Sequence, residues 1–197
     1  MKKLFTTIAL VALSATAFAQ LDFGVGYLSQ TMKISASAGG YTETESENLN
    51  GFYVGADYTV AKLGPVNVTP GAYLALSSYK EGEGKINLFA LDIPVNFSYG
   101  IDFSSAVRGF IYAGPTFEIG ITADEKAGDY TLNMYEDMLK RFDIKLGGGI
   151  GVDINSLIRV TAGYNAGLLN LLKKDIYPGV DTKCKTNQFH VGVAYLF

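Results

Sequence analysis

The chain has 197 residues and a formal charge of −3, with one Cys, one His and no Trp. A mildly acidic chain offers no basic surface for nucleic acid, and one Cys can form neither an internal disulfide nor a cysteine metal site. The 23 Gly, 13 Tyr and 12 Phe, against only 5 Pro, favour a β-rich fold.

The first twenty residues have the pattern of a secretory signal. Lys2 and Lys3 precede an apolar run over 4–13, and Ala17-Phe18-Ala19 supplies the small residues that signal peptidase requires. The run is shorter than the roughly 20 residues that cross a bilayer as a helix. We therefore expect a signal peptide over 1–19 and one mature domain over 20–197, whose formal charge falls from −3 to −5 when Lys2 and Lys3 are removed.

Apolar and polar residues alternate with period two in eight later segments, which predicts eight strands. These segments cover 21–27, 52–60, 66–77, 89–99, 107–119, 141–153, 158–167 and 188–197. Pro94 and Pro115 each remove a backbone donor, so irregular pairing is expected beside them. Leu88 and Phe110 are apolar residues on the otherwise polar face and do not fit the pattern.

The connections alternate in length. Those over 62–65, 100–104 and 155–156 are tight, and those over 35–48, 122–140 and 170–186 are long; the one over 80–85 is short and polar. Short turns at one rim and long loops at the other are typical of outer-membrane barrels. Within the long loop over 122–140, residues 132–139 could form a short amphipathic helix, with Leu132, Tyr135 and Leu139 on one side.

The composition of the two faces favours a membrane barrel over a soluble sandwich or lipocalin-like barrel. A water-facing surface would be rich in Lys and Glu, whereas the polar face here is mostly Gly, Ser, Thr and Asn with few charges of mixed sign. The opposite face carries no charge, as contact with lipid demands. We therefore predict an eight-stranded antiparallel up-and-down transmembrane β-barrel, closed because an open edge in hydrocarbon would leave backbone groups unsatisfied.

Several motifs add a family resemblance. They are Leu91-Asp92-Ile93-Pro94-Val95, Tyr112-Ala113-Gly114-Pro115, Arg141-Phe142-Asp143 with the glycines after it, Tyr164-Asn165-Ala166-Gly167-Leu168, and Val191-Gly192-Val193-Ala194-Tyr195-Leu196-Phe197. In these the chain resembles the PorT-like, porin-type outer-membrane β-barrel family of Gram-negative bacteria. The resemblance implies insertion by the outer-membrane assembly machinery, with Tyr195 and Phe197 in its recognition signal. Members of that family include a secretion-system component, and the family has no catalytic residues to carry over.

Charged and titratable residues of the polar face are predicted to meet inside the barrel. They are Asp92, Arg108, Glu118, Arg141, Asp143, Lys145, Asp153, Arg159 and His190, with Asp22 and Asp57 on the same face. Buried charges must pair, and eight strands leave a lumen just wide enough for side chains, so a plugged interior is expected rather than a conducting pore. His190 is expected to be a lumenal polar residue; the alternative is a lipid-modifying enzyme that uses it with a Ser and an acid.

The long loops carry charges of opposite sign. The first holds Glu43, Glu45 and Glu47, and the last holds Lys173, Lys174, Lys183 and Lys185. Because strand eight closes beside strand one, the two loops could attract each other or could be separate solvated surfaces. Cys184, in the last loop, is either a bystander or an intermolecular thiol.

Together these patterns predict an integral outer-membrane protein with a structural or interaction role and no catalysis, cofactor or metal. Its expected partners are outer-membrane lipid, the assembly machinery and surface or secretion-complex proteins, and not nucleic acid. The alternatives are a component of a secretion or surface-assembly complex, a narrow porin-like channel, and a lipid-modifying enzyme.

Overall fold

A computed structural model describes residues 21–38, 41–81, 84–127, 130–173 and 181–197. Residues 1–20 lie outside these ranges, so the signal peptide stays a prediction. The elements are β1 Leu21–Ala38, β2 Tyr41–Tyr58, β3 Ala61–Leu63, β4 Val66–Glu81, β5 Gly84–Asp102, β6 Val107–Ala127, β7 Tyr130–Asn133, α2 Met134–Asp137, β8 Phe142–Ile154, β9 Ile158–Gly167 and β10 Asp181–Leu196. No helix in the described ranges is long and apolar enough to span a membrane.

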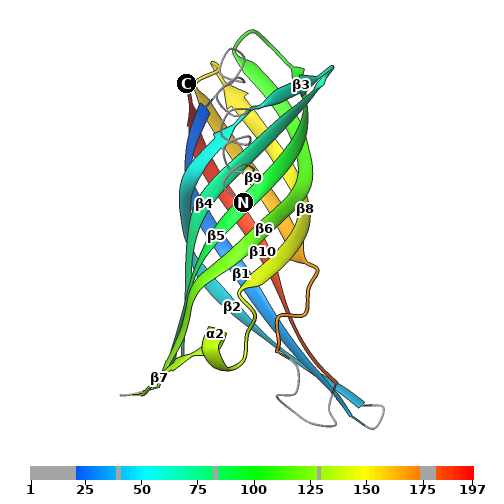
Figure 1. Ribbon diagram of the computed structural model, residues 1–197. Helices are drawn as coiled ribbons and strands as arrows, with labels where there is room; N and C mark the ends of the chain where they lie inside the picture. The colour runs from blue at the N-terminus through cyan, green and yellow to red at the C-terminus, as the bar shows by residue number, and fades with distance from the viewer. Residues whose placement is uncertain (1–20, 39–40, 82–83, 128–129, 174–180) are drawn as a thin grey trace, which may run out of the picture.

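The strands form one closed antiparallel barrel (Figure 1). Neighbours follow the order β2-β1-β10-β9-β8-β6-β5-β4, and pairing of β2 with β4 closes the ring. The short strand β3 pairs with β4 at one end of the barrel, and the short strand β7 pairs with β6 at the other end. The predicted eight-stranded barrel is therefore confirmed.

Alternate side chains point out of the barrel, and the outward face is apolar over a continuous belt. Exposed large apolar residues on it include Phe23, Val25, Phe52, Val54, Leu74, Phe97, Ile111, Leu146, Ile150, Val160, Phe189, Val191 and Val193. Beyond Tyr27 and Phe189 the outward face becomes polar, with Lys33 and Lys185 directly opposite each other. An apolar belt of this kind is expected where every second side chain of a strand contacts lipid acyl chains, because charged groups are costly there.

The tight turns lie at the end of the barrel that also holds Phe197, whose N–H donates to the carbonyl of Leu21 (3.1 Å) (Figure 1). Asn155 and Ser156 have φ of 53° and 51°, the left-handed conformation of a two-residue hairpin turn. Gly64 has φ of 63° in the turn between β3 and β4, where a side chain would be strained. We call this end the turn end and the opposite end the loop end.

At the loop end the strands are longer than the sequence pattern predicted. The expected loop 35–48 is instead a paired ribbon, in which β1 and β2 remain in register as far as Ala38 and Tyr41. Hydrogen-bonded pairs hold its outward face: Thr31 to Asn48 (2.7 Å), Ser35 with Thr44 (3.0 Å) and Ser37 with Thr42 (2.9 Å). The prediction was wrong because outside the belt both faces are largely polar, so a strand shows no apolar alternation.

The expected loop 122–140 is also largely ordered. β6 runs to Ala127 and pairs with β7, and the predicted helix is a single turn capped by the Asn133 side chain, which accepts from the Tyr135 N–H (3.1 Å). Leu139 is buried, whereas Leu132 lies in β7 and is 40% exposed. In the expected loop 170–186, β10 begins at Asp181, and 174–180 lie outside the described residues.

Pairing is irregular beside both prolines, as predicted. The β5–β6 ladder is interrupted at Val95 and Asn96, opposite Gly114 and Pro115. A separate register shift lies between Phe89 and Ala90, which the sequence pattern did not indicate.

Candidate functional site

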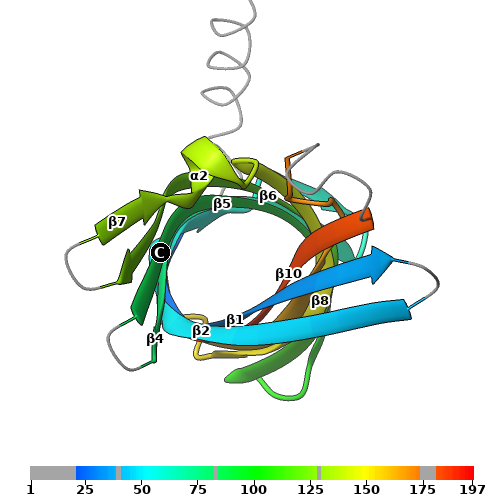
Figure 2. The same ribbon diagram turned by 90° about the horizontal axis from the view of Figure 1, so that it is seen from below.

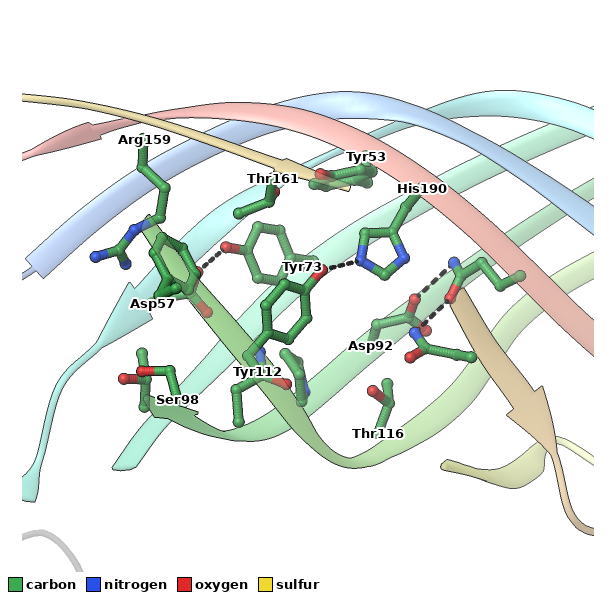
Figure 3. Close-up of a pocket in the computed structure, with 16 residues that line it drawn as sticks. Tyr53, Asp57, Tyr73, Asp92, Ser98, Tyr112, Thr116, Arg159, Thr161 and His190 are labelled. Atoms are coloured by element: carbon green, nitrogen blue, oxygen red, sulfur yellow. Dashed lines mark hydrogen bonds between the residues drawn. The ribbon is translucent and has the colours of Figure 1, made fainter. Parts of the chain in front are cut away.

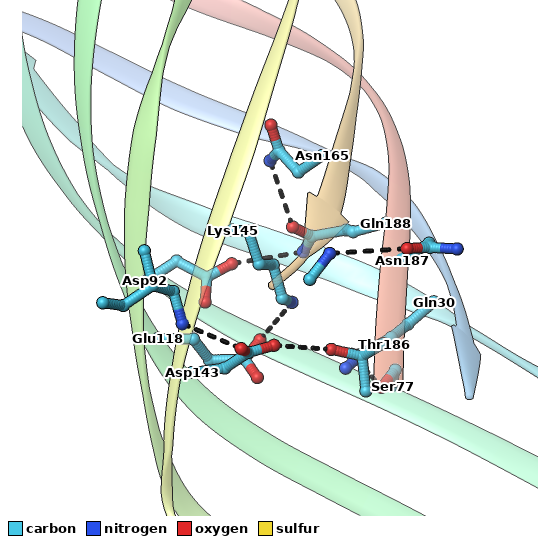
Figure 4. Close-up of polar contacts among 12 residues, drawn as sticks. Gln30, Ser77, Asp92, Glu118, Asp143, Lys145, Asn165, Thr186, Asn187 and Gln188 are labelled. Carbon is cyan, nitrogen blue, oxygen red and sulfur yellow. Dashed lines mark hydrogen bonds and ion pairs between the residues drawn. The ribbon is translucent and has the colours of Figure 1, made fainter. Parts of the chain in front are cut away.

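The interior of the barrel is a layered polar lumen. At the centre, three acids on neighbouring strands stand side by side. The register places Asp92 opposite Glu118, and Glu118 opposite Asp143. Lys145, whose side chain is fully buried, donates to Glu118 at 2.5 Å (Figure 4). One ammonium therefore stands among three carboxyl groups, a dense arrangement of buried charge.

Uncharged polar side chains extend this central layer. Gln188 donates through Nε2 to Asp92 Oδ2 (3.1 Å) and accepts from Asn165 (3.4 Å), while the Thr186 hydroxyl donates to Asp143 (3.0 Å). The sequence did not predict these uncharged residues as site residues. For Gln188 and Asn165 the signal was their position on the polar face of the alternating pattern, whereas Thr186 falls in the segment expected to be a loop.

A second charged cluster lies at the turn end. The Arg159 guanidinium donates to both carboxylate oxygens of Asp153 (2.7 and 3.1 Å) and to Asp22 (2.6 Å). Arg108 Nη1 lies 3.5 Å from Asp153 Oδ2, and Arg108 Nε lies 3.7 Å from Asp102 Oδ1. A bidentate guanidinium pair of this kind fixes orientation as well as charge, so Arg159 ties β9 to β8 and, across β10, to β1.

Between the two clusters lies a cavity of about 110 Å³ whose wall is rich in aromatic rings (Figure 3). The Tyr73 hydroxyl donates to Asp57, and Tyr112 is hydrogen-bonded to His190 Nε2 (2.9 Å). The ring of Tyr53 packs edge-on against both Tyr73 and His190. Side chains at Gly163 would not fit, because a Cβ there would collide with Tyr112 and His190.

The cavity has room for several water molecules, since one needs only about 10–15 Å³ of such space. Two carboxylate oxygens on its wall, Asp57 Oδ1 and Asp92 Oδ1, have no hydrogen-bond partner among the described residues. Within those residues, no three His, Cys, Asp or Glu side chains are grouped so as to hold a metal. The site is therefore suited to hold polar molecules as small as water.

Phe110 and Leu88, the two misfits of the alternating pattern, are explained by their surroundings. Phe110 lines the cavity, and the Arg159 guanidinium lies 4.9 Å above the centre of its ring. A ring in that position can take a cation on its face. Leu88 belongs to an apolar cluster at the loop end, described next.

The loop end of the lumen is filled by apolar side chains. This group, which we call the apolar cap, consists of Met32, Leu49, Leu88, Ala123, Met134, Leu139, Leu171, Leu172 and Cys184. It joins residues of the long strands to the segment around α2, which lies at the rim of the loop end in Figure 2. The Cys184 thiol is buried in this cluster, so it is part of the packing rather than an accessible nucleophile.

Of the predicted lumen residues, Arg141 lies apart from the network. The β6–β8 register ends with Ile119 opposite Phe142, so Arg141 stands beyond the strand at the loop end. There its guanidinium donates to the carbonyls of Gly120 (3.3 Å) and Ile121 (2.7 Å). Its Cζ lies over the Tyr135 ring, 5.0 Å from the ring centre. The prediction extended the alternating pattern by one residue too many.

The acids and bases of the first and last loops lie on opposite faces of one sheet. In the register, Glu43, Glu45 and Glu47 share the face of Met32, while Lys183 and Lys185 share the face of Lys33. Lys173 instead donates to the carbonyls of Tyr135 (3.0 Å) and Glu136 (2.5 Å), and Lys174 lies outside the described residues. This geometry favours the separate solvated surfaces over mutual attraction.

At the turn end, the C-terminal residues form an aromatic group. The Phe197 ring packs edge-on against Tyr195 (4.6 Å between ring centres) and Phe23 (5.6 Å). Such rings at a strand end suit the interfacial girdle of a membrane barrel. Recognition of Tyr195 and Phe197 by the assembly machinery stays a prediction.

Comparison with known proteins fits this architecture. The family model described as "Outer membrane protein beta-barrel domain" matches residues 5–197. The chain belongs to this outer-membrane β-barrel family. It is accordingly a protein of the outer membrane of a Gram-negative bacterium, as the sequence predicted. A comparison with curated protein sequences found no match.

Several solved structures of outer-membrane proteins are similar to this chain at low sequence identity. The outer membrane enzyme PagL has 11% identity and a TM-score of 0.51, covering 84% of this chain and 97% of its own. Neisserial surface protein A has 17% identity and a TM-score of 0.48, covering 89% and 97%. Ail, the attachment invasion locus protein of Yersinia pestis, has 14% identity and a TM-score of 0.45, covering 91% and 99%. PagL is described as an enzyme, but a shared fold at 11% identity does not decide the activity of this chain.

Proposed function

We propose that this outer-membrane barrel has a closed lumen and acts through structure and interaction rather than transport or catalysis. The observation that carries the proposal is the stacking of three layers along the lumen. These are the Arg159 cluster at the turn end, the Lys145 layer at the centre and the apolar cap at the loop end. An ion would have to displace a buried ion pair and then pass a dry apolar cluster, and both steps are costly.

The first test is electrical. In planar bilayers the purified barrel is expected to give no discrete conductance steps at physiological salt, whereas a porin inserted under the same conditions gives them. The reason is that eight strands leave a lumen only wide enough for side chains, and charged groups occupy it here. Reproducible unitary steps that scale with protein concentration would support the alternative of a narrow channel and contradict a closed lumen.

A lipid-modifying enzyme is disfavoured by the position of His190. Its ring faces the cavity and bonds Tyr112, so the barrel wall stands between it and the surrounding lipid. A lipid-modifying nucleophile would instead be needed at the rim or outer surface, where the substrate lies. Replacing His190 with Ala is expected to leave the lipid A and phospholipid composition of the outer membrane unchanged in mass spectra. A modified lipid species that disappears with His190→Ala would establish the enzyme.

The finer alternative is a PorT-like component of a secretion or surface-assembly complex. The motif resemblance supports it, and so does the ordered loop end, where β1, β2 and β10 extend well beyond the apolar belt. Cross-linking in intact cells, followed by purification from detergent extracts, would recover defined partners of a complex member. A solitary barrel would yield only the assembly machinery.

A further inference from the structure

The barrel wall divides at the loop end between β2 and β4. Their pairing runs from Asp57 opposite Gly71 to Asn50 opposite Ser78 and stops there. Beyond that point β2 stays with β1, while β4 continues with β5 to Glu81. Figures 1 and 2 show the result: β10, β1 and β2 leave the ring on one side, and β4 to β7 leave it on the other.

This division leaves one side of β2 without a neighbouring strand. Over residues 41–48, which we call the β2 edge, the only strand paired with β2 in the described ranges is β1. Eight extended residues span roughly 26 Å, and every second one directs its N–H and C=O away from β1. Backbone groups in this arrangement are a ready template for another strand.

The β2 edge carries an alternating chemical pattern. Glu43, Glu45 and Glu47 lie on one face, and Thr42, Thr44, Ser46 and Asn48 lie on the other. Glu43 and Glu45 are exposed, and the face of three acids continues along the strand without an intervening base. On one face of an added strand, the side chains would therefore lie beside the negative charges of Glu43, Glu45 and Glu47.

These charges distinguish between two possible occupants. Antiparallel pairing of two copies through this edge, in the register centred on Glu45, would set Glu45 opposite Glu45 and Glu43 opposite Glu47, and like charges directly opposite each other destabilise a strand pair. A strand with Lys or Arg at alternate positions would instead place opposite charges across the ladder. Charge repulsion thus disfavours pairing of the β2 edge with a second copy of itself, and charge attraction favours pairing with a basic strand.

We propose that the β2 edge binds an extended basic peptide segment of a partner protein by β-strand addition. Main-chain hydrogen bonds to residues 41–48 would supply most of the affinity, and Glu43, Glu45 and Glu47 would select the partner. This inference rests on the proposed interaction role. Its failure would leave the closed lumen, which is tested by conductance, unaffected.

The test uses the full-length barrel in lipid nanodiscs and a nine-residue peptide of alternating Lys and Thr. Saturating peptide is expected to slow hydrogen exchange at alternate amides of residues 41–48 by at least about tenfold, because those amides become hydrogen-bonded. The same peptide with N-methyl groups on alternate backbone nitrogens keeps its charge but cannot complete the ladder. It is expected to give no such protection.

Side-chain selection is tested with two variants of equal charge. Changing Glu43, Glu45 and Glu47 to Gln is expected to raise the Kd about tenfold, since three exposed ion pairs of up to 1 kcal/mol each are lost. The matched variant Asp124→Asn, Glu125→Gln and Asp137→Asn, on the other side of the division, is expected to change it less than about twofold. Absent protection, equal protection by the N-methylated peptide, or equal effects of the two variants would each overturn the proposal.

Discussion

Replacing Lys145 with Met is expected to lower the free energy of unfolding by about 3–5 kcal/mol. The ammonium group of Lys145 faces Glu118, Asp92 and Asp143 in the central layer, and the Lys145 side chain has no exposed surface. Met fills nearly the same volume but removes the charge, so the carboxyl groups would remain buried beside one another. Removing one partner of a buried pair costs far more than removing a surface charge.

The measurement is urea unfolding of the barrel in lipid vesicles, followed by the shift between folded and unfolded bands on unboiled gels. Lys85→Met, at an exposed lysine of β5, is the matched control and is expected to stay within about 0.5 kcal/mol of the parent. Adding Glu118→Gln to Lys145→Met should recover part of the loss, because one of the uncompensated charges is then removed. A Lys145→Met barrel as stable as the Lys85→Met control would contradict the paired central layer.

Replacing Val193 with Arg is expected to cost roughly 2–4 kcal/mol, the cost of a charged residue at the lipid-facing midplane of a barrel. Val193 is half-exposed on the outward face of β10, and its register partners are Val25 on β1 and Val160 on β9. Aromatic residues stand toward each end of the same face, Tyr195 on one side and Phe189 on the other. This places Val193 near the middle of the apolar belt.

The same vesicle assay provides the comparison. Thr44→Arg puts the same charge on the outward face of β2 beyond the belt and is expected to change stability by no more than about 0.5 kcal/mol. If both arginine variants unfold at the same urea concentration, the belt does not face lipid at Val193. The difference between the two positions, rather than either value alone, measures the depth of the belt.

The sequence by itself determined the barrel and the direction of its side chains. Lipid tolerates no charge on the outward face, so the period-two pattern separates residues such as Val193 from lumenal neighbours such as His190 without knowledge of any contact. The turn at Asn155 and Ser156 was equally predictable, because two residues between alternating segments permit few backbone conformations. Both features depend on local pattern alone.

Tertiary structure decided which lumenal groups meet. Asp22 and Arg159 are 137 positions apart and form a 2.6 Å ion pair only because ring closure brings β1 and β9 to the two sides of β10. The sequence likewise could not place Gln188 and Asn165 together, or gather Leu49, Leu139 and Cys184 into the apolar cap. Each of these contacts depends on the register of strands that are distant in the chain.

The loop end shows most clearly where local pattern fails. Residues 41–48 are strand, yet they read as a polar loop because water, not lipid, surrounds them on most sides. The pairing of β2 with β4 ends at Asn50 opposite Ser78, and this end point depends on the register of two strands, which neither segment encodes alone. The lipid-facing belt could be read from the sequence because contact with acyl chains disfavours charge, whereas the free edge of β2 became visible only in the folded molecule, where the strand pairing ends.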